Sequence, residues 1–179
     1  QDNWLILTRT LSRAKEICDL LKVKGLYYEN RHQKSYNTKL YKAIINHSKW
    51  LSGEEVPDTA LEDIKEYLGN RELKKDLKWF ECFDNAPADD KIYIRLMLSN
   101  KERLSDEARI KISTIHAAKG GECKNVILVL DNAKKIREAV TKSIIKRDEE
   151  HRVWYVGCTR AKRNLYLMRA KIERKGYQL

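Results

Sequence analysis

The sequence contains no phosphate-binding loop of the form G-x-x-x-x-G-K-[ST], so this chain lacks the segment that grips the phosphates in P-loop enzymes. Its four cysteines include no C-x-x-C pair, which argues against a zinc centre or a disulfide framework, and no metal site is expected. No apolar run approaches the roughly 20 residues that a membrane-spanning helix needs, and no signal peptide opens the chain. We therefore expect a cytoplasmic protein without a membrane partner.

Proline and glycine are also scarce, at two and seven of 179 residues. With 42% hydrophobic and 35% charged residues, the composition is that of a globular protein and excludes a disordered or fibrous one. The length suits one domain, or one domain with an insertion. Because the first residue is Gln1 and not Met, we expect a piece of a longer protein.

Positive charge is in excess, with 37 Lys and Arg against 26 Asp and Glu, a net charge of +11. Such an excess favours a polyanionic partner, most simply nucleic acid. The charges are interspersed along the chain, so a merely solubilising surface is the alternative interpretation.

An α/β pattern occupies both ends of the chain. A short apolar run is followed by a helical face over residues 10–22, which Thr10 can cap and Gly25 can end. Near the other end, a continuous run of β-branched residues and leucine is typical of a strand buried on both faces of a parallel sheet. The predicted strands are residues 4–8, 26–28, 108–114, 124–130 and 164–168.

The middle of the chain has helical periodicity instead. We expect helices near residues 40–51, 56–69, 71–83 and 88–100, and we assign residues 53–105 to an inserted helical block. Trp79, Phe80 and Phe83 could stack on bases of a single strand, but their spacing favours the core of this block, and Trp154 is expected to be packed as well.

Two segments carry residues suited to a nucleotide or phosphate ligand. In "STIHAAKGGE" a strand delivers Thr114 and His116 to its end, and the following glycines let a phosphate approach the backbone. In "YVGCTRA" Arg160 follows a predicted helix, where its planar, permanently charged group can reach a phosphate. Taken alone, the first segment could equally be an ordinary connection with surface cations, and a lone arginine such as Arg160 is more often a surface residue.

Together these segments resemble motifs of the second RecA-like motor domain of superfamily 1 DNA helicases of the UvrD/Rep/PcrA type. Motif V, T-x-H-x-x-K-G-x-E, is matched by Thr114, His116, Lys119, Gly120 and Glu122. Motif VI, Y-V-(A/G)-x-T-R-A, is matched by residues 155–161, and the acidic pair before it by Glu149 and Glu150. Motif IV, an arginine between a strand and a helix, is matched by residues 5–17 with Arg9 in the key place. The resemblance covers about residues 1–52 and 108–170.

The resemblance implies a RecA-like α/β fold, a parallel sheet flanked by helices, formed by residues 1–52 and 106–179. Residues 53–105 would then be a reduced all-helical insertion. It also implies that ATP with Mg²⁺ is held mainly by an N-terminal RecA-like domain of the same polypeptide, which accounts for the missing phosphate loop. Single-stranded DNA is the other implied partner, and a bacterial or phage-infected cell the implied setting.

The family's site roles are carried over residue by residue. Arg160 is expected to be the arginine finger that reaches the γ-phosphate across the cleft, with Arg9 as a second arginine doing so. The nucleotide site is expected to include Glu122, on the sugar, together with Lys119, Gly120 and Gly157. Thr114 and His116 are expected to contact the backbone of single-stranded DNA.

Three departures from the family pattern bear on these roles. Thr8 stands where the family usually has an aromatic that stacks on adenine, Gly121 stands where Leu is common, and the inserted block is short. The resemblance nevertheless implies an ATP-dependent, 3′ to 5′ single-strand translocase or helicase half that is inactive alone. The alternatives are a nucleic-acid-binding module on a degenerate helicase fold, without ATPase activity, and the motor half of a helicase–nuclease.

Overall fold

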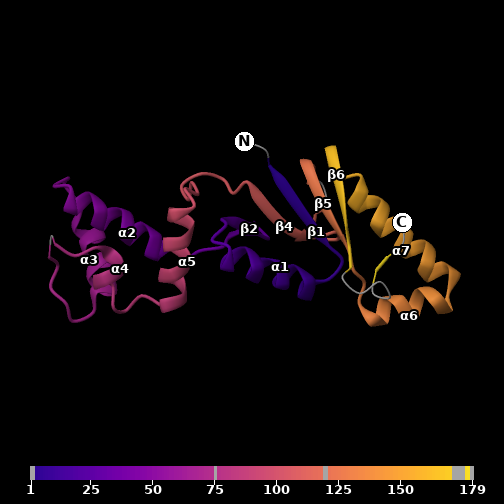
Figure 1. Ribbon diagram of the computed structural model, residues 1–179, viewed down its shortest axis with the longest axis horizontal. Helices are drawn as coiled ribbons and strands as arrows, with labels where there is room; N and C mark the ends of the chain where they lie inside the picture. Colours follow the sequence, from indigo (N-terminus) through magenta and orange to yellow (C-terminus); the bar gives the residue numbers. More distant parts are fainter. Residues whose placement is uncertain (1–2, 75, 119–120, 171–175, 178–179) are drawn as a thin grey trace.

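The structure is a computed structural model that describes residues 3–74, 76–118, 121–170 and 176–177. In chain order its elements are β1 (Trp4–Thr8), α1 (Leu11–Val23), β2 (Tyr28–Asn30), β3 (Gln33–Lys34), α2 (Thr38–Leu51), α3 (Asp58–Leu68), α4 (Trp79–Cys82), α5 (Ala88–Ser99), β4 (Ile110–Thr114), β5 (Cys123–Leu130), α6 (Lys134–Lys142), α7 (Ile144–Cys158) and β6 (Ala161–Arg169). The molecule is elongated, with the sheet towards one end, α2–α4 at the other and α5 between them (Figure 1).

The six strands form one sheet in the order β3-β2-β4-β1-β5-β6. β1 lies in its centre and pairs in parallel with both β4 and β5, while β2 and β6 extend the parallel sheet on either side. The short strand β3 runs antiparallel to β2 at one edge. This arrangement, with helices on the sheet, confirms the predicted RecA-like α/β fold.

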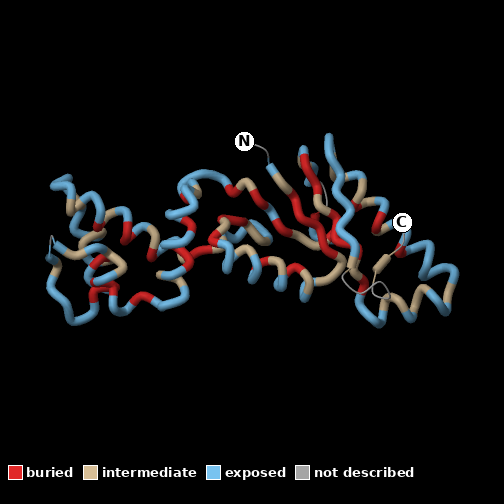
Figure 2. The backbone as a smooth tube through the Cα atoms, in the orientation of Figure 1, coloured by how far each residue is buried: buried red, intermediate tan, exposed pale blue. Residues whose placement is uncertain are grey.

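Alternation along β1 sends side chains to two cores. Ile6 lies in a cluster with Ala14 and Cys18 of α1, while Leu5 and Leu7 lie in a second cluster with Trp154 of α7. The sheet is therefore covered by α1 on one face and by α7 on the other, because successive side chains of a strand point to opposite faces. The strands β1, β4 and β5 are largely buried as a result, whereas β6 is exposed along most of its length (Figure 2).

The prediction that residues 124–130 form a strand buried on both faces is confirmed. Val126 and Leu128 of β5 belong to the α7-side cluster and Val129 to the α1-side cluster. The packed position expected for Trp154 is also confirmed, since its side chain is fully buried. Phe83 is fully buried as well, which confirms core packing for that aromatic, while Trp79 and Phe80 are half-buried.

Two expected elements differ from the structure. The sequence predicts a helix over residues 71–83, but the helix is only Trp79–Cys82, because the Lys78 N–H donates to the Glu81 carboxylate and caps the helix there. The second strand lies at Tyr28–Asn30, slightly later than predicted, and turns back into β3. That short hairpin has no strong signal in the sequence because its turn residues, Arg31 and His32, adopt positive φ without being Gly or Asn.

The helical block shares a core with the α1 side of the sheet. Leu40 of α2, Ile64 of α3 and Met97 of α5 belong to the same buried cluster as the α1 residues. The rings of His47 in α2 and Phe83 lie 5.3 Å apart, so α2 packs with the block that follows it. The division at residues 53–105 stays a prediction. No helix in the described part of the chain is long and apolar enough to cross a membrane.

Candidate functional site

The carboxyl edge of the sheet holds the first group of predicted site residues. Thr8 and Thr114 are paired at the ends of β1 and β4, which places Arg9 and His116 just beyond that edge. The Thr114 hydroxyl accepts a hydrogen bond from the Ala117 N–H at 3.3 Å and so helps to form the turn that follows β4. The structure therefore brings Arg9, Thr114 and His116 to one edge.

Arg9 is held there by a carboxylate from the middle of α7. Its Nε donates to both carboxylate oxygens of Glu150, at 2.9 and 3.2 Å, and its Nη2 donates to Oε2 at 2.9 Å. The Glu150 side chain is only 5% exposed and that of Arg9 17%. A buried, two-pronged pair of this kind is geometrically specific, and removing one partner leaves an uncompensated charge.

A hollow of about 420 Å³ opens beside this ion pair, between α6 and α7. His116 lies exposed on its rim, and Lys135 of α6 and Lys146 of α7 add positive charge. The floor includes apolar side chains such as Val153. Glu149 also lines the hollow and forms an ion pair with Lys146 at 2.8 Å, so the lining combines both signs of charge with apolar surface.

The second group of residues lies at the opposite, amino edge of the sheet. The Cys123 N–H donates to the Arg160 carbonyl at 3.0 Å, which sets the start of β5 beside the start of β6. Glu122, immediately before β5, forms an ion pair with Lys162 of β6 at 3.2 Å. Lys162 has no role predicted from the sequence, because no motif includes it and the predicted strand begins only at residue 164. Glu122 and Arg160 are thus neighbours.

Arg160 differs from Arg9 in its partners. Its Nε donates to the Val156 carbonyl at 3.1 Å and its Nη2 to the Thr159 hydroxyl at 3.4 Å, so its own helix end orients the side chain. Within the described residues no carboxylate forms an ion pair with it. The charge of this guanidinium is therefore not neutralised by a carboxylate.

The two predicted arginine fingers do not lie together. Trp4 of β1 is level with Asn125 of β5, and Arg160 bonds to Cys123, two residues before Asn125. Arg9 lies five residues after Trp4, so about seven residues of strand separate the arginines, roughly 23 Å at the rise of a strand. The nucleotide contacts expected for both arginines stay predictions.

The segment between β4 and β5 connects the two edges. It leaves the carboxyl edge at Thr114 and reaches the amino edge at Glu122, and its Ile115 and Ala118 side chains are buried in the α7-side core. Gly157 of α7 is buried against it, since a Cβ there would lie 2.9 Å from Leu128 and 3.4 Å from Ile115. Close packing thus accounts for this glycine, and its predicted nucleotide contact stays a prediction. Lys119 and Gly120 lie outside the described residues.

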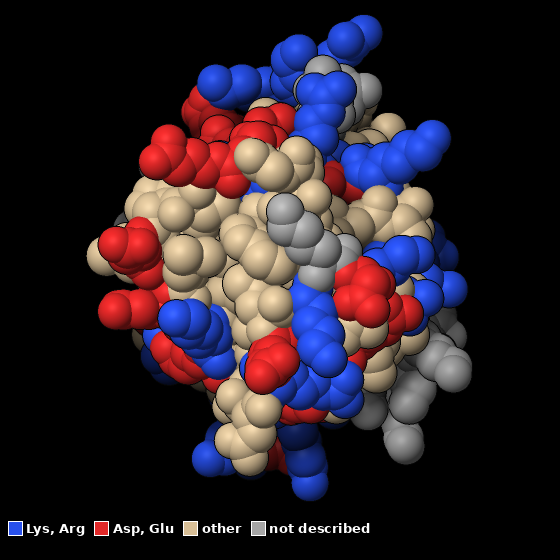
Figure 3. All heavy atoms as spheres, turned by 90° about the vertical axis from the view of Figure 1, so that its left-hand side faces the viewer, with Lys and Arg blue, Asp and Glu red and all other residues tan. Residues whose placement is uncertain are grey.

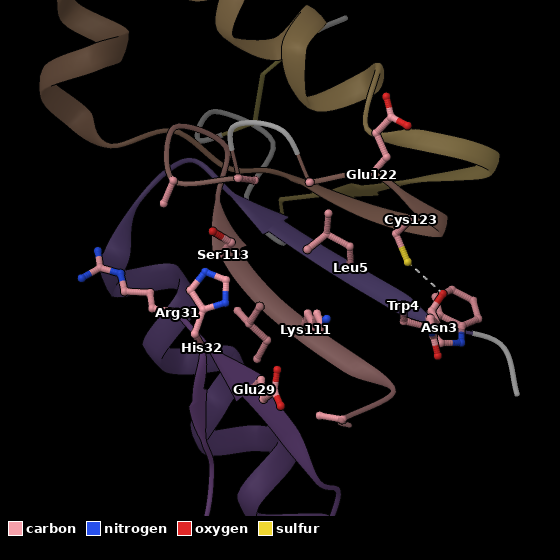
Figure 4. Close-up of a pocket in the computed structure, with 15 residues that line it drawn as sticks. Asn3, Trp4, Leu5, Glu29, Arg31, His32, Lys111, Ser113, Glu122 and Cys123 are labelled. Atoms are coloured by element: carbon pink, nitrogen blue, oxygen red, sulfur yellow. Dashed lines mark hydrogen bonds between the residues drawn. The ribbon is translucent and has the colours of Figure 1, made fainter. Parts of the chain in front are cut away.

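A further hollow of about 310 Å³, which the sequence did not predict, lies over β1 and β4 beside this segment (Figure 4). Arg31 and His32 approach it from the β2–β3 turn and Lys111 from β4, while Glu122 lies near the segment's end (Figure 4). The positive φ values of Arg31 and His32, 51° and 65°, are backbone strain in a two-residue turn. The hollow is mixed in charge and shares Glu122 with the amino edge.

The basic excess is not gathered on the helical end of the molecule. Lys and Arg side chains there are interspersed with Asp and Glu over α2–α4 (Figure 3). Ion pairs such as Lys39–Glu66, at 2.6 Å, and Arg71–Asp84, at 2.5 Å, neutralise part of the positive charge within the helical end. The helical end is therefore not a continuous basic surface for a polyanion.

Comparison with known proteins finds a family match in the second half of the chain. The family model described as UvrD-like helicase C-terminal domain matches residues 91–171, from α5 through β4, β5 and α7 to β6. A search of curated proteins found no match. The matched region contains both the segment from Thr114 to Glu122 and the end of α7 with Arg160, so this part of the chain is similar to the C-terminal domain of UvrD-like helicases.

Proposed function

We propose that this chain is the second motor half of an ATP-driven translocase on single-stranded DNA, moving 3′ to 5′ like the helicases it resembles. An N-terminal RecA-like domain of the same polypeptide completes the ATP site in this proposal and supplies the phosphate loop. The observation that carries it is the amino edge, where Arg160, without a carboxylate partner among the described residues, lies beside Glu122 in a chain without a phosphate loop.

The residues at this edge are suited to contact a nucleotide that is bound mainly by another domain. An arginine whose backbone and Nε are fixed can present its remaining N–H groups to a γ-phosphate. Such a finger increases the rate of hydrolysis about 10³–10⁵-fold. Glu122, half-exposed, can accept hydrogen bonds from the sugar hydroxyls once it exchanges Lys162 for them. The described residues include no cluster of three or more metal ligands, so in the proposal the Mg²⁺ ligands also come from the other domain.

The carboxyl edge is proposed as the surface for single-stranded DNA. Thr114 and His116 lie at this edge, and Lys135 in the neighbouring hollow adds positive charge. Arg9 also follows this edge, where Glu150 holds it, and in the proposal it remains the second arginine of the nucleotide site. ATP binding draws the two motor domains together, hydrolysis releases them, and alternating grip on the strand gives a step.

The test is ATP hydrolysis by the complete polypeptide, with and without single-stranded DNA. Arg160→Ala is expected to lower the DNA-stimulated kcat about 10³-fold while ATP binding is largely kept, because the finger stabilises charge in the transition state. Arg163→Ala is the matched control, an exposed arginine three residues further along β6, and is expected to leave the rate within about twofold.

The alternative is a nucleic-acid-binding module without ATPase activity. The basic net charge and Thr8 at the usual adenine-stacking position favour it. If the wild-type polypeptide binds single-stranded DNA but shows no DNA-stimulated ATP hydrolysis, this alternative replaces the motor.

A further inference from the structure

We propose that the outer edge of β6 is a docking site for an extended protein segment with an apolar centre and acidic ends, which adds to the sheet as a further strand. The sequence of β6, AKRNLYLMR, places cations on both sides of four adjacent apolar residues. This inference does not depend on the proposed function, because β6 contains none of the residues assigned to the nucleotide or to DNA.

The apolar residues of β6 are exposed on both faces of the sheet. Leu165 and Leu167 point to the α7 face, because they are level with residues of β5 that belong to the α7-side cluster. By alternation Tyr166 and Met168 point to the α1 face, where the Tyr166 ring lies 5.3 Å from that of Trp4. All four side chains are nevertheless 38–50% exposed, and the strand is open along most of its length (Figure 2). A contiguous apolar surface of this kind is typical of an interaction site.

The backbone of this edge is also open to pairing. β6 ends the strand order of the sheet, and in the described part of the chain no strand lies on its other side. Native sheets usually protect an edge with a short strand, a proline, a bulge or a charge within the strand. β6 has nine residues and no proline, its irregular pairing with β5 lies near its start, and its cations flank the apolar run without interrupting it. An incoming strand can therefore pair with its N–H and C=O groups.

The charges of β6 determine which segment fits. Lys162 and Arg163 precede the apolar run, Arg169 follows it, and the strand has no acidic residue. Lys162 pairs with Glu122, whereas Arg163 and Arg169 form no ion pair within the residues that the structure describes. Opposite charges on neighbouring strands are favourable. A strand with acidic residues at both ends therefore meets cations whether it pairs parallel or antiparallel to β6.

A second copy of β6 fits this edge poorly. Antiparallel pairing about Tyr166 would place Arg163 of each strand opposite Arg169 of the other, and like charges directly opposite are destabilising. A nucleic acid would match the charge, but it has no backbone ladder that pairs with the N–H and C=O groups of a strand edge. A polypeptide strand uses the edge, the apolar run and the cations together.

The experiment measures the binding of two labelled synthetic peptides to the complete polypeptide by fluorescence anisotropy. Both peptides have the length of β6 and alternate Val and Thr in their centre, but one has Asp and Glu at its ends and the other has Lys. We expect the peptide with acidic ends to bind at least tenfold more tightly. Tyr166→Lys, which puts a charge into the apolar run, is expected to weaken this binding at least tenfold. Val23→Lys, at an exposed apolar residue of α1, is the matched control and is expected to leave the Kd within twofold.

A charge-reversed variant separates docking from a local effect on folding. Arg163→Glu with Arg169→Glu keeps the apolar run and the open edge but reverses the flanking charges. It is expected to bind the peptide with lysine ends more tightly than the one with acidic ends. A strand that was merely disturbed by the substitutions would lose affinity for both peptides instead.

Three results would overturn the proposal. Equal binding of the two peptides, or binding of neither, would show that the edge does not select an acidic segment. A wild-type dimer in sedimentation velocity that Tyr166→Lys abolishes would make a second copy the occupant. Displacement of the bound peptide by single-stranded DNA, with loss of DNA affinity in Tyr166→Lys, would assign the edge to nucleic acid.

Discussion

Arg9 and Arg160 are the same residue type in two opposite situations. A buried carboxylate holds Arg9, whereas Arg160 is oriented by a backbone carbonyl and a hydroxyl and forms no ion pair among the described residues. An arginine finger has to bring uncompensated positive charge to a developing anion, so Arg160 is the better prepared of the two arginines for the role we propose.

Also at the residue scale, Gly25 allows the chain after α1 to pack closely against α5. Its φ is +63°, and a Cβ there would lie 2.7 Å from the Leu96 Cβ and 3.1 Å from its backbone carbon. We expect Gly25→Ala to lower the free energy of unfolding by about 2–4 kcal/mol, as strained backbone and overpacking add. Urea denaturation measures this.

Gly53→Ala serves as the control for that prediction. Gly53 also has a positive φ, +83°, but no atom lies within 4 Å of the position that a Cβ would take there. Only the backbone cost of about 1 kcal/mol is then expected. Equal losses in both variants would show that the contact with α5 adds nothing.

At the scale of elements, α7 is the part that unites the site. It contributes Glu150 at the carboxyl edge, Trp154 to the core and the turn that orients Arg160 at the amino edge. The segment from Thr114 to Glu122 runs between the same two edges and packs on α7 through Ile115. α7 and the described residues of this segment therefore pack against each other on one face of the sheet.

α2 carries an acid-sensitive contact. His47 is 1% exposed, 3.8 Å from the Cys82 sulfur and packed edge-on to Phe83, and burial lowers its pKa below the ordinary 6.5. The unfolded chain then binds the proton more readily, so stability is complete above about pH 6.5 and is lost as the pH falls below it.

His47→Leu is expected to reduce the loss of folding stability between pH 7 and pH 5, because no titrating group then remains at the position. Urea midpoints at the two pH values measure the effect. Replacing the exposed His32 by Leu is the control and is expected to leave the pH dependence as in wild type. A wild-type midpoint that does not move over this range would contradict the prediction.

At the scale of the whole molecule, one buried cluster runs from α1 and the sheet into the helical block. It contains Ile112 of β4, Ala14 of α1 and Ile64 of α3. A core shared in this way makes separate unfolding of the two ends unfavourable, because unfolding one end alone would expose apolar surface of the other end to water. We therefore expect the chain to unfold as one cooperative unit.

Tryptophan fluorescence tests this, since Trp50 and Trp79 lie at the helical end and Trp154 lies in α7. Variants that keep only Trp50 and Trp79, or only Trp154, are expected to give the same urea midpoint. Midpoints that differ by more than about 1 M would show that residues 53–105 form an independent domain.

Local sequence was enough to predict the strand and helix pattern at both ends, the buried character of β5 and the family motifs. These depend on the spacing of apolar residues and on short runs of chemically specific side chains, which are readable without long-range contacts. The hairpin at β2–β3 and the true start of α4 could not be predicted in this way, because a strained turn and a single capping carboxylate determine them.

Which motif residues meet depends on tertiary structure alone. The order of the motifs along the chain does not determine the order of the strands in the sheet, so the sequence could not predict that Arg9 and Arg160 follow opposite edges of the parallel strands β1, β5 and β6. The buried pairing of Arg9 with Glu150 joins residues 141 positions apart. Such contacts arise when strands and helices pack, and local periodicity carries no information about them.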